Sequence, residues 1–385
     1  RNGKTKQLTR GEGWHNCEIS PDGKYFSDNY SSLNVPRVVA VGSTDGKIYR
    51  EVFRAEDPSK DYNYSTIELG SVKSAAGKYN NHYRLIKPLD LSGMENLEYV
   101  DCFYNEMTSL NISNCPKLKW VYCYSNKLSE IFFNGSNNIE FLQAYNNNLT
   151  SLDVSGMPEL FYFDVLLNDL REVNFSNCPK LQIAAVGNND LISLDLSGLP
   201  NLYTLGCYDN NISSLDLSGL PMLKMLECYA NNIAKLDLSA NTVLSSVTCH
   251  NNLISELNID NCPNLRLIDC SSNRLEGTFD LNKFSGLERV SCGGNNFTKI
   301  EVSACTKLTE LSCENTSITS LNVSTLTALE KLIANDCLLT TMDCSNNRAL
   351  KTLYLQGNPL TSLILANGQS IVDLKIDNYD VIEYK

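Results

Sequence analysis

Apolar residues recur at a fixed spacing over most of the chain. From Leu97 onward the pattern LxxLxCxxNxLxxLxLSxxPx repeats every 21 residues, with a single step of 22 residues. The 13 full units begin at residues 97, 118, 139, 160, 181, 202, 223, 244, 265, 287, 308, 329 and 350. A half-unit from Leu89 precedes them, and a degenerate unit from Ile371 follows. A period of this length predicts a solenoid in which each coil buries its apolar side chains against the next.

The fixed positions within the unit predict where the core lies. Positions one, four and eleven are apolar in every full unit, so we expect them to face the interior. Position nine is Asn in 11 of 13 units, with Thr316 and Cys337 as departures. Because an amide both donates and accepts hydrogen bonds, a ladder of Asn side chains would satisfy turn backbone in successive coils. The unit with 22 residues should contain one bulge, near Gly277.

This pattern resembles the leucine-rich repeat family. A Cys at position six in a unit of 21 residues is similar to the cysteine-ladder repeats of internalin J. The resemblance covers residues 89–385 and implies one short strand per unit, in a parallel sheet on the concave side. The remaining dozen or so residues of each unit are too few for a long helix, so we expect extended or 3-10 segments on the convex side.

Cysteines are numerous, and their spacing predicts packing rather than disulfides. Eight stand at position six, where other units have Ala, Val or Leu: 102, 123, 207, 228, 249, 270, 292 and 313. In-register parallel strands lie about 4.8 Å apart, which is too far for a relaxed disulfide between like positions. We therefore expect reduced, stacked thiols. Four further cysteines at position nineteen and Cys344 at position sixteen are also predicted to pack, whereas the pattern predicts no role for Cys17 or Cys337.

Residues 1–88 lack the repeat and predict a small antiparallel β unit. The pattern strand, Asp-Gly turn, strand occurs twice, over 17–32 and 35–53. A further hairpin is expected over 71–88. We place the domain boundary at residue 88, with the repeat solenoid over 89–385.

Four segments of this N-terminal part stand in an order that resembles the dipeptidyl peptidase IV family, at the end of its propeller and the entry strands of its hydrolase domain. The matching segments are QLTRGEGWHN (7–16), SPDGKYF (20–26), VPRV (35–38) and YRLIKP (83–88). The family would next place a nucleophilic serine on a sharp turn, but the repeat begins instead and no GxSxG occurs in the chain. We interpret residues 1–88 as a cap on the first coil, with a retained recognition module as the alternative.

Positions three, five and seven should point to the concave surface, because side chains alternate along a strand. Eight of these twelve positions in the first four units are aromatic, whereas later units carry small or charged groups. We predict ligand binding by Tyr99, Asp101, Phe103, Trp120, Tyr122, Tyr124, Phe141, Gln143, Tyr145, Tyr162, Asp164, Tyr208 and Tyr229. Trp120 is expected at the centre of the first group, beside Tyr99 and Phe141. The alternative is that these rings stack on one another and are partly covered by residues 1–88.

Charge and composition narrow the partners. The formal net charge is -12 with a pI near 4.8, which argues against nucleic acid. There is no run of 18 apolar residues, so no membrane span is predicted. The three histidines lack the close pairing with other ligands that a metal site requires, and we expect no metal and no cofactor.

The sequence therefore predicts a non-enzymatic binding or adhesion module, monomeric, with a protein ligand on the concave face of the repeats. One alternative is a glycan-binding surface protein, since flat rings beside Asp and Gln also suit sugars. Another is a residual or inactive protein related to serine dipeptidyl peptidases. The chain begins at Arg1 without a visible leader, and a secreted or cell-surface location, in a bacterial setting, is expected from the family resemblance alone.

Overall fold

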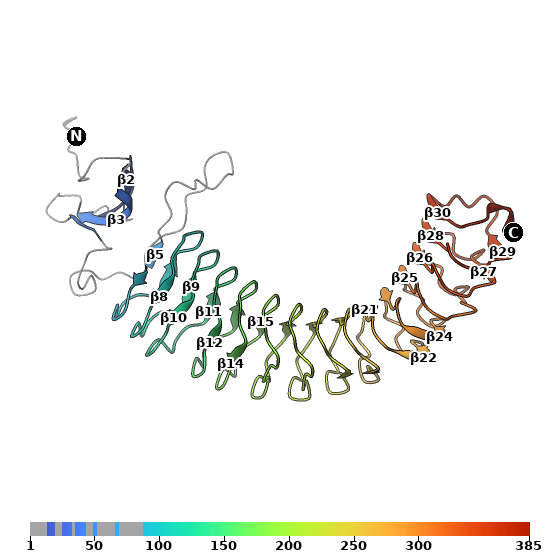
Figure 1. Ribbon diagram of the computed structural model, residues 1–385, viewed down its shortest axis with the longest axis horizontal. Coiled ribbons are helices and arrows are strands. Elements are labelled where there is room, and N and C mark those ends of the chain that lie inside the picture. The colour runs from blue at the N-terminus through green and yellow to red at the C-terminus, as the bar shows by residue number, and fades with distance from the viewer. Residues whose placement is uncertain (1–13, 20–24, 33–34, 44–48, 52–65, 69–87) are drawn as a thin grey trace. The chain divides into compact units, whose positions relative to one another are not determined.

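The computed structural model describes most of the chain as stacked coils with short strands (Figure 1). The described residues are 14–19, 25–32, 35–43, 49–51, 66–68 and 88–385. They form two compact units, Arg1–Cys178 and Pro179–Lys385, which are treated separately below.

The first unit begins with a four-stranded antiparallel sheet in the order β1-β2-β3-β4. Its strands are β1 (Trp14–Ile19), β2 (Tyr25–Ser32), β3 (Val35–Ser43) and β4 (Tyr49–Glu51). The antiparallel pairing of β1 with β2 and of β3 with β4 confirms the two expected strand pairs. Both Asp-Gly turns lie outside the described residues, as does the hairpin expected over 71–88 apart from Pro88 itself. The role of this sheet as a cap stays a prediction.

The repeats of the first unit build a parallel sheet, whose solvent side we call the strand face; it corresponds to the predicted concave surface. Its strands are β5 (Thr66–Glu68), β7 (Tyr99–Asp101), β9 (Trp120–Tyr122), β11 (Phe141–Gln143) and β13 (Tyr162–Asp164). Like positions lie in register, as in the pairing of Tyr99 with Trp120 and of Trp120 with Phe141. Strand β5 is an addition to the prediction: it pairs in parallel with β7 although it precedes the periodic sequence.

The second unit continues the same architecture over ten strands. They are β15 (Ile183–Ala185), β16 (Thr204–Gly206), β17 (Met225–Glu227), β19 (Ser246–Thr248), β21 (Leu267–Asp269), β23 (Arg289–Ser291), β25 (Glu310–Ser312), β26 (Lys331–Ile333), β28 (Thr352–Tyr354) and β30 (Asp373–Lys375). All 13 face strands expected from the full sequence repeats are therefore present in the two compact units together, and β30 comes from the degenerate final repeat.

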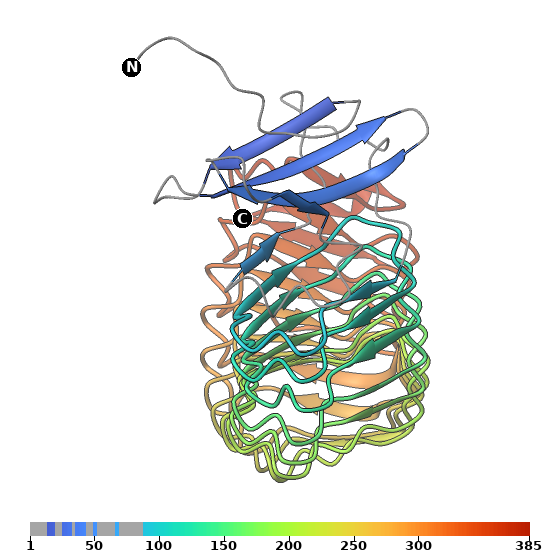
Figure 2. The same cartoon turned by 90° about the vertical axis from the view of Figure 1, so that its left-hand side faces the viewer.

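The opposite side of each coil, which we call the return face, is extended, as expected. Figure 2 looks along the coils and shows strands on both sides of them. The return strands are β6 (Leu89–Asp90), β8 (Ser109–Asn111), β10 (Glu130–Phe132), β12 (Ser151–Asp153), β14 (Glu172–Asn174), β18 (Lys235–Asp237), β20 (Glu256–Asn258), β22 (Glu276–Asp280), β24 (Asn296–Glu301), β27 (Thr341–Asp343), β29 (Ser362–Leu365) and β31 (Ile382–Tyr384). Within the described residues the only helix is a 3-10 turn, η2 (Tyr379–Val381), so the fold is a parallel β-solenoid.

The expected bulge is confirmed in the unit of 22 residues. The pairing of β22 with β24 shifts register between Gly277 and Thr278. Gly277 has a φ of 75°, a left-handed conformation that glycine adopts without steric cost.

The core follows the repeat positions. Every residue at positions one and four is buried, and position eleven is buried except at Leu360 in the last full unit. All 14 cysteines with described side chains are free and buried, in agreement with the predicted thiols. Burial raises the pKa of the Cys207 thiol to about 12. The pKa of every other described thiol is raised as well, except that of Cys337, which hydrogen bonding with Cys313 and Thr316 lowers to about 6. The thiols with a raised pKa are therefore protonated and unreactive near neutral pH.

Candidate functional site

The ends of the face strands are held by the ladder of Asn side chains at position nine. The Nδ2 of Asn147 donates to Cys123 O of the preceding coil at 3.1 Å and to Ala144 O of its own coil at 2.9 Å. Its Oδ1 accepts from the backbone N of Leu128, again in the preceding coil, at 3.0 Å. The predicted ladder is confirmed, and it fixes the turn that follows the side chain at position seven.

The two departures from Asn at position nine provide part of the same hydrogen bonding. Thr316 Oγ1 donates to Cys313 O at 2.9 Å. Cys337 Sγ is 3.4 Å from both Cys313 O and Asn335 O, which are the carbonyls that an Asn amide would reach. Cys337, for which the sequence predicted no role, is thus a rung of the ladder.

A second ladder, which the sequence analysis missed, runs along position nineteen. Cys115 Sγ donates to Leu91 O at 3.3 Å, and Ser136 Oγ donates to Ile112 O at 2.6 Å. Asn241 Nδ2 donates to Leu217 O at 3.0 Å in the same way. The thiols at this position are therefore buried donors as well as packing groups. The presence of Ser and Asn at the same position was the signal that could have revealed this.

On the strand face of the first unit, rings at position seven form a stack. The centroids of Phe103 and Tyr124 are 4.6 Å apart with planes at 4°. Those of Tyr124 and Tyr145 are 4.5 Å apart with planes at 9°. Tyr104 packs edge-on against the first two rings, at 5.5 and 5.6 Å. In-register strands place like rings one above another, so the stack follows directly from the repeat.

A second row of rings lies beside this stack, and Tyr122 is at its centre. The Tyr122 ring is 5.3 Å from Tyr99 and 5.0 Å from Phe141, and Phe141 in turn stacks on Tyr162 at 4.2 Å. Trp120, expected at this centre, is in register with Tyr99 and Phe141, but its ring contact is with Lys119 Nζ at 5.6 Å. The ring of Tyr122 therefore packs against one ring from each of the two neighbouring strands, β7 and β11.

Polar groups adjoin the second row. The carboxylate of Asp164 is buried and accepts hydrogen bonds from Leu166 N at 3.3 Å and from Gln143 Nε2 at 3.4 Å. Gln143 Nε2 also donates to the hydroxyl of Tyr162 at 3.4 Å. Burial raises the pKa of Asp164, and burial together with Asp101 raises that of Tyr122. The structure therefore brings the predicted residues of these four coils together as half-buried rings beside one buried carboxyl.

The second unit has a ring stack of its own at position seven. Tyr208 stacks on Tyr229 at 4.7 Å, and Tyr229 stacks on His250 at 4.5 Å. A Cβ at Gly187 would lie 2.8 Å from the ring of Tyr208, so only glycine leaves room for that ring. His250 Nδ1 is 3.3 Å from Asp269 Oδ2, within ion-pair distance but without hydrogen-bond geometry.

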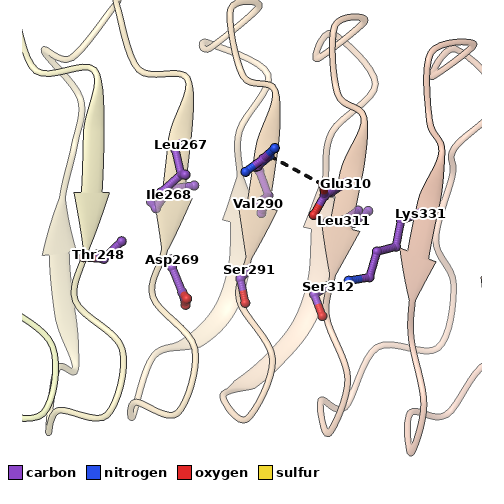
Figure 3. A pocket seen from close by; sticks show the side chains of 11 residues that line it. Thr248, Leu267, Ile268, Asp269, Val290, Ser291, Glu310, Leu311, Ser312 and Lys331 are labelled. Carbon is purple, nitrogen blue, oxygen red and sulfur yellow. Dashed lines mark ion pairs between the residues drawn. The ribbon is translucent and has the colours of Figure 1, made fainter. Parts of the chain in front are cut away.

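Towards the C-terminal strands, from Thr248 of β19 to Lys331 of β26, the strand face becomes polar and contains a hollow of about 280 Å³. Figure 3 shows Thr248, Asp269, Ser291 and Ser312 in a row across four adjacent strands. Arg289 Nε pairs with Glu310 Oε1 at 3.5 Å beside them. The sequence analysis had noted these positions only as small or charged.

Two further observations concern metal ions and membranes. In the part of the chain that the structure describes, no cluster of three or more His, Cys, Asp or Glu side chains is arranged to hold a metal ion. None of the helices in that part has the length and hydropathy that a membrane crossing requires.

Comparison with known proteins identifies the architecture. No family model matches the chain. The functional domain of InlJ from Listeria monocytogenes, which includes a cysteine ladder, is similar with 29% identity and a TM-score of 0.65, over 70% of this chain and 62% of that one. YopM, a leucine-rich effector protein from Yersinia pestis, has 21% identity and a TM-score of 0.67, over 82% and 89% of the two chains. The fold is a leucine-rich repeat solenoid.

This solenoid shares its buried cysteine ladder with the InlJ domain, and the match spans less than two thirds of the InlJ chain. A plant peptide hormone receptor, RGFR1 in complex with RGF2, has 22% identity and a TM-score of 0.57, over 75% of this chain and 49% of the receptor. These likenesses concern the repeats. The resemblance of residues 1–88 to the dipeptidyl peptidase IV family stays a prediction.

Proposed function

We propose that this chain is a non-enzymatic binding module that recognises a protein or peptide segment on the strand face of its first unit. The observation that carries the proposal is the row Tyr99, Tyr122, Phe141 and Tyr162, whose rings are held by one another beside Gln143 and Asp164. The likeness to a receptor in complex with a peptide hormone supports this fold as a scaffold for such ligands. An exported, cell-surface or secreted location belongs to the same proposal.

Rings that are already held lose little conformational freedom when a ligand binds. Tyr122 lies between the rings of Tyr99 and Phe141, and its side chain is half-buried. Tyr and Trp in such positions commonly supply most of the binding energy of an interface. The half-buried Gln143, paired with the buried Asp164, adds directional hydrogen bonding next to the apolar row.

The test is to probe a protein and glycan array with the full chain, and to measure the best ligand against the variant Tyr122→Ala. An aromatic anchor at the centre of an interface is worth about 2 kcal/mol or more, so affinity should fall about 30-fold. Tyr384→Ala is the matched control, because Tyr384 is 57% exposed and lies on the last return strand. Equal affinity for both variants would reject the strand face of the first unit as the binding site.

A glycan ligand is the second candidate. The stack of Tyr208, Tyr229 and His250 next to a hydroxyl-rich hollow favours it, since flat rings and hydroxyl or carboxyl partners suit sugars. Binding to glycans and not to proteins on the same array, with loss on Tyr229→Ala, would favour this reading. The peptidase alternative is tested separately below.

A further inference from the structure

A second hollow, which we call the rim groove, lies in the second unit away from positions three, five and seven of the strand face. Its volume is about 740 Å³, within the range of roughly 300–1,000 Å³ typical of ligand sites. Its walls come from position two and from the last residues, positions 20 to 22, of consecutive repeat units, on the turns that lead into the face strands. The side chains that matter here are Tyr203, Lys224, Arg266, Met222, Val243 and Lys307.

The rim groove exposes large apolar side chains that the repeat does not require. Met222 is 51% exposed, Tyr203 is 41% exposed and Val243 is 36% exposed. Most other units carry charged, amide or small side chains at these two positions, such as Glu98, Lys117 and Ala328. Adjacent exposed apolar residues on a soluble surface indicate an interaction site.

The charge of the groove opposes that of the chain. Lys224 Nζ lies 5.4 Å from the ring centroid of Tyr203, and Lys307 is exposed. Among the described residues neither lysine has a carboxylate within ion-pair distance, whereas Arg266 pairs with Glu288 at 3.2 Å. Two uncompensated cations thus border an apolar surface on a chain of net charge -12.

The backbone of the position-two residues along this rim is already paired between coils. Ser245 N donates to Lys224 O, Arg266 N donates to Ser245 O, and Glu288 N donates to Arg266 O, at 2.8 to 2.9 Å. A partner therefore cannot be recognised by strand addition here and must be recognised through its side chains.

One residue opens the wall of the groove. Gly286 lines it, and a Cβ at this position would meet only Leu265 O, at an ordinary 3.5 Å. Its backbone does not have a positive φ, so the turn does not require glycine. The missing side chain leaves space between neighbours in the wall.

We propose that the rim groove docks an acidic, extended segment of a partner protein that also carries large apolar side chains. The apolar side chains pack on Tyr203, Met222 and Val243, while carboxylates pair with Lys224 and Lys307. The walls span five coils, about 19 Å at about 4.8 Å per coil, which matches about six extended residues. This site is separate from the strand face and does not depend on the function proposed for it.

The experiment selects peptides from a random phage-displayed library against the full chain, and measures synthetic fluorescein-labelled copies by anisotropy. We expect selected peptides in which Asp or Glu accompanies Phe, Leu or Trp. Their affinity should fall at least tenfold for Lys224→Glu/Lys307→Glu and for Gly286→Leu, and should weaken as salt is added. It should be unchanged for Tyr122→Ala, which perturbs the strand face of the first unit.

Lys235→Glu is the control for one lysine reversal away from the groove, since Lys235 lies on return strand β18, in an exposed pair with Glu256. Circular dichroism melting confirms that each variant is folded. Recovery of no acidic peptide, or of acidic peptides that bind the doubly charge-reversed variant as tightly as the parent chain, overturns the proposal. The proposal is also overturned if charge reversal weakens binding to vesicles of anionic lipid but not binding to the peptides, because the groove would then be a membrane contact.

Discussion

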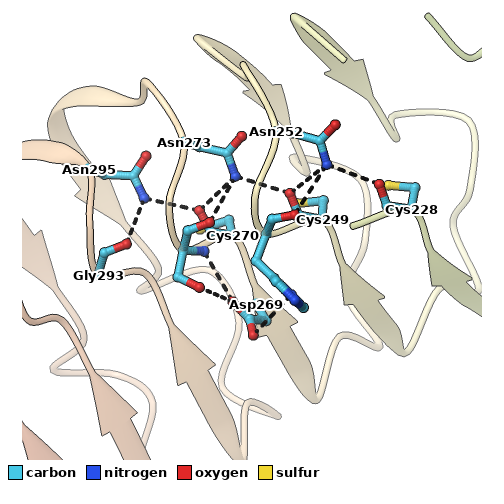
Figure 4. Close-up of polar contacts among 10 residues, drawn as sticks. Cys228, Cys249, Asn252, Asp269, Cys270, Asn273, Gly293 and Asn295 are labelled. Carbon is cyan, nitrogen blue, oxygen red and sulfur yellow. Dashed lines mark hydrogen bonds and ion pairs between the residues drawn. The ribbon is translucent and has the colours of Figure 1, made fainter. Parts of the chain in front are cut away.

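Replacement of Asn252 by Ala tests whether the Asn ladder holds the coils together. Asn252 Nδ2 donates to Cys228 O at 2.9 Å, to Cys249 O at 3.1 Å and to His250 O at 3.3 Å (Figure 4). Its Oδ1 accepts from Ile233 N at 3.0 Å, and the residue is 6% exposed. Every one of these bonds is lost in the variant.

The size of the effect follows from which groups keep another partner. Cys228 O also accepts from Asn231 Nδ2, and Cys249 O also accepts from Asn273 Nδ2, so both carbonyls stay paired. The Ile233 N–H donates to Asn252 Oδ1, and the variant takes this acceptor away. A buried donor left unpaired costs about 1–3 kcal/mol, and the lost amide bonds add about 1 kcal/mol. We expect Asn252→Ala to lower the free energy of unfolding by about 3 kcal/mol.

Urea unfolding followed by circular dichroism measures this loss, and amide exchange at Ile233 measures the local part of it. Exchange at that amide should accelerate about 30-fold for each 2 kcal/mol of local destabilisation. Asn232→Ala is the control, because Asn232 is exposed and directly follows the ladder residue Asn231 in the preceding coil. A cost of Asn252→Ala below about 0.5 kcal/mol, or equal to that of the control, would refute the reasoning.

Three further predictions can be checked on the same protein. Burial raises the pKa of the Cys207 thiol from 9.0 to about 12, so the stability gained by keeping this thiol protonated is complete below pH 9 and is lost as the pH rises towards 12. The urea midpoint of unfolding should therefore fall between pH 9 and 12, and Cys207→Ala should make this fall shallower. Gly187→Ala should displace the Tyr208 ring and cost about 1 kcal/mol of stability. Gly206→Ala should keep the ring stack, because a Cβ at Gly206 has no contact closer than 3.6 Å, and the chemical shifts of the Tyr229 ring report the difference between the two variants. The chain should not hydrolyse a chromogenic dipeptide substrate, and turnover that survives further purification and is abolished by a serine-directed inhibitor would contradict this.

The repeat was predictable because each coil buries the same positions. Positions one and four are defined by what the next coil must cover, so their burial can be read from one sequence, and the step of 22 residues located the bulge at Gly277. Strand β5 was not predicted, because a single strand that pairs with the first coil has no period to reveal it. Cys337 was equally hidden, since its role depends on a carbonyl 24 residues earlier in the chain.

The candidate site was predictable in position but not in detail. Alternation along the strands placed the rings on one face, and in-register pairing produced the stacks. Which ring leans into which gap is decided by side-chain conformation, so Tyr122 rather than Trp120 takes the centre of the second row. The rim groove was missed because it arises from positions that precede the strands and have no fixed residue type in the repeat.

The bonds of each Asn rung reach only its own coil and the one before. Asn147, for example, bonds to Cys123 O and Leu128 N and to nothing further away. In-frame duplication or deletion of the DNA that encodes one whole unit therefore leaves every remaining rung with an equivalent neighbour, whereas loss of part of a unit breaks two coils at once. Such a gene can change the length of its product by unequal recombination while the Asn ladder stays continuous, and each event lengthens or shortens the strand face by one strand spacing.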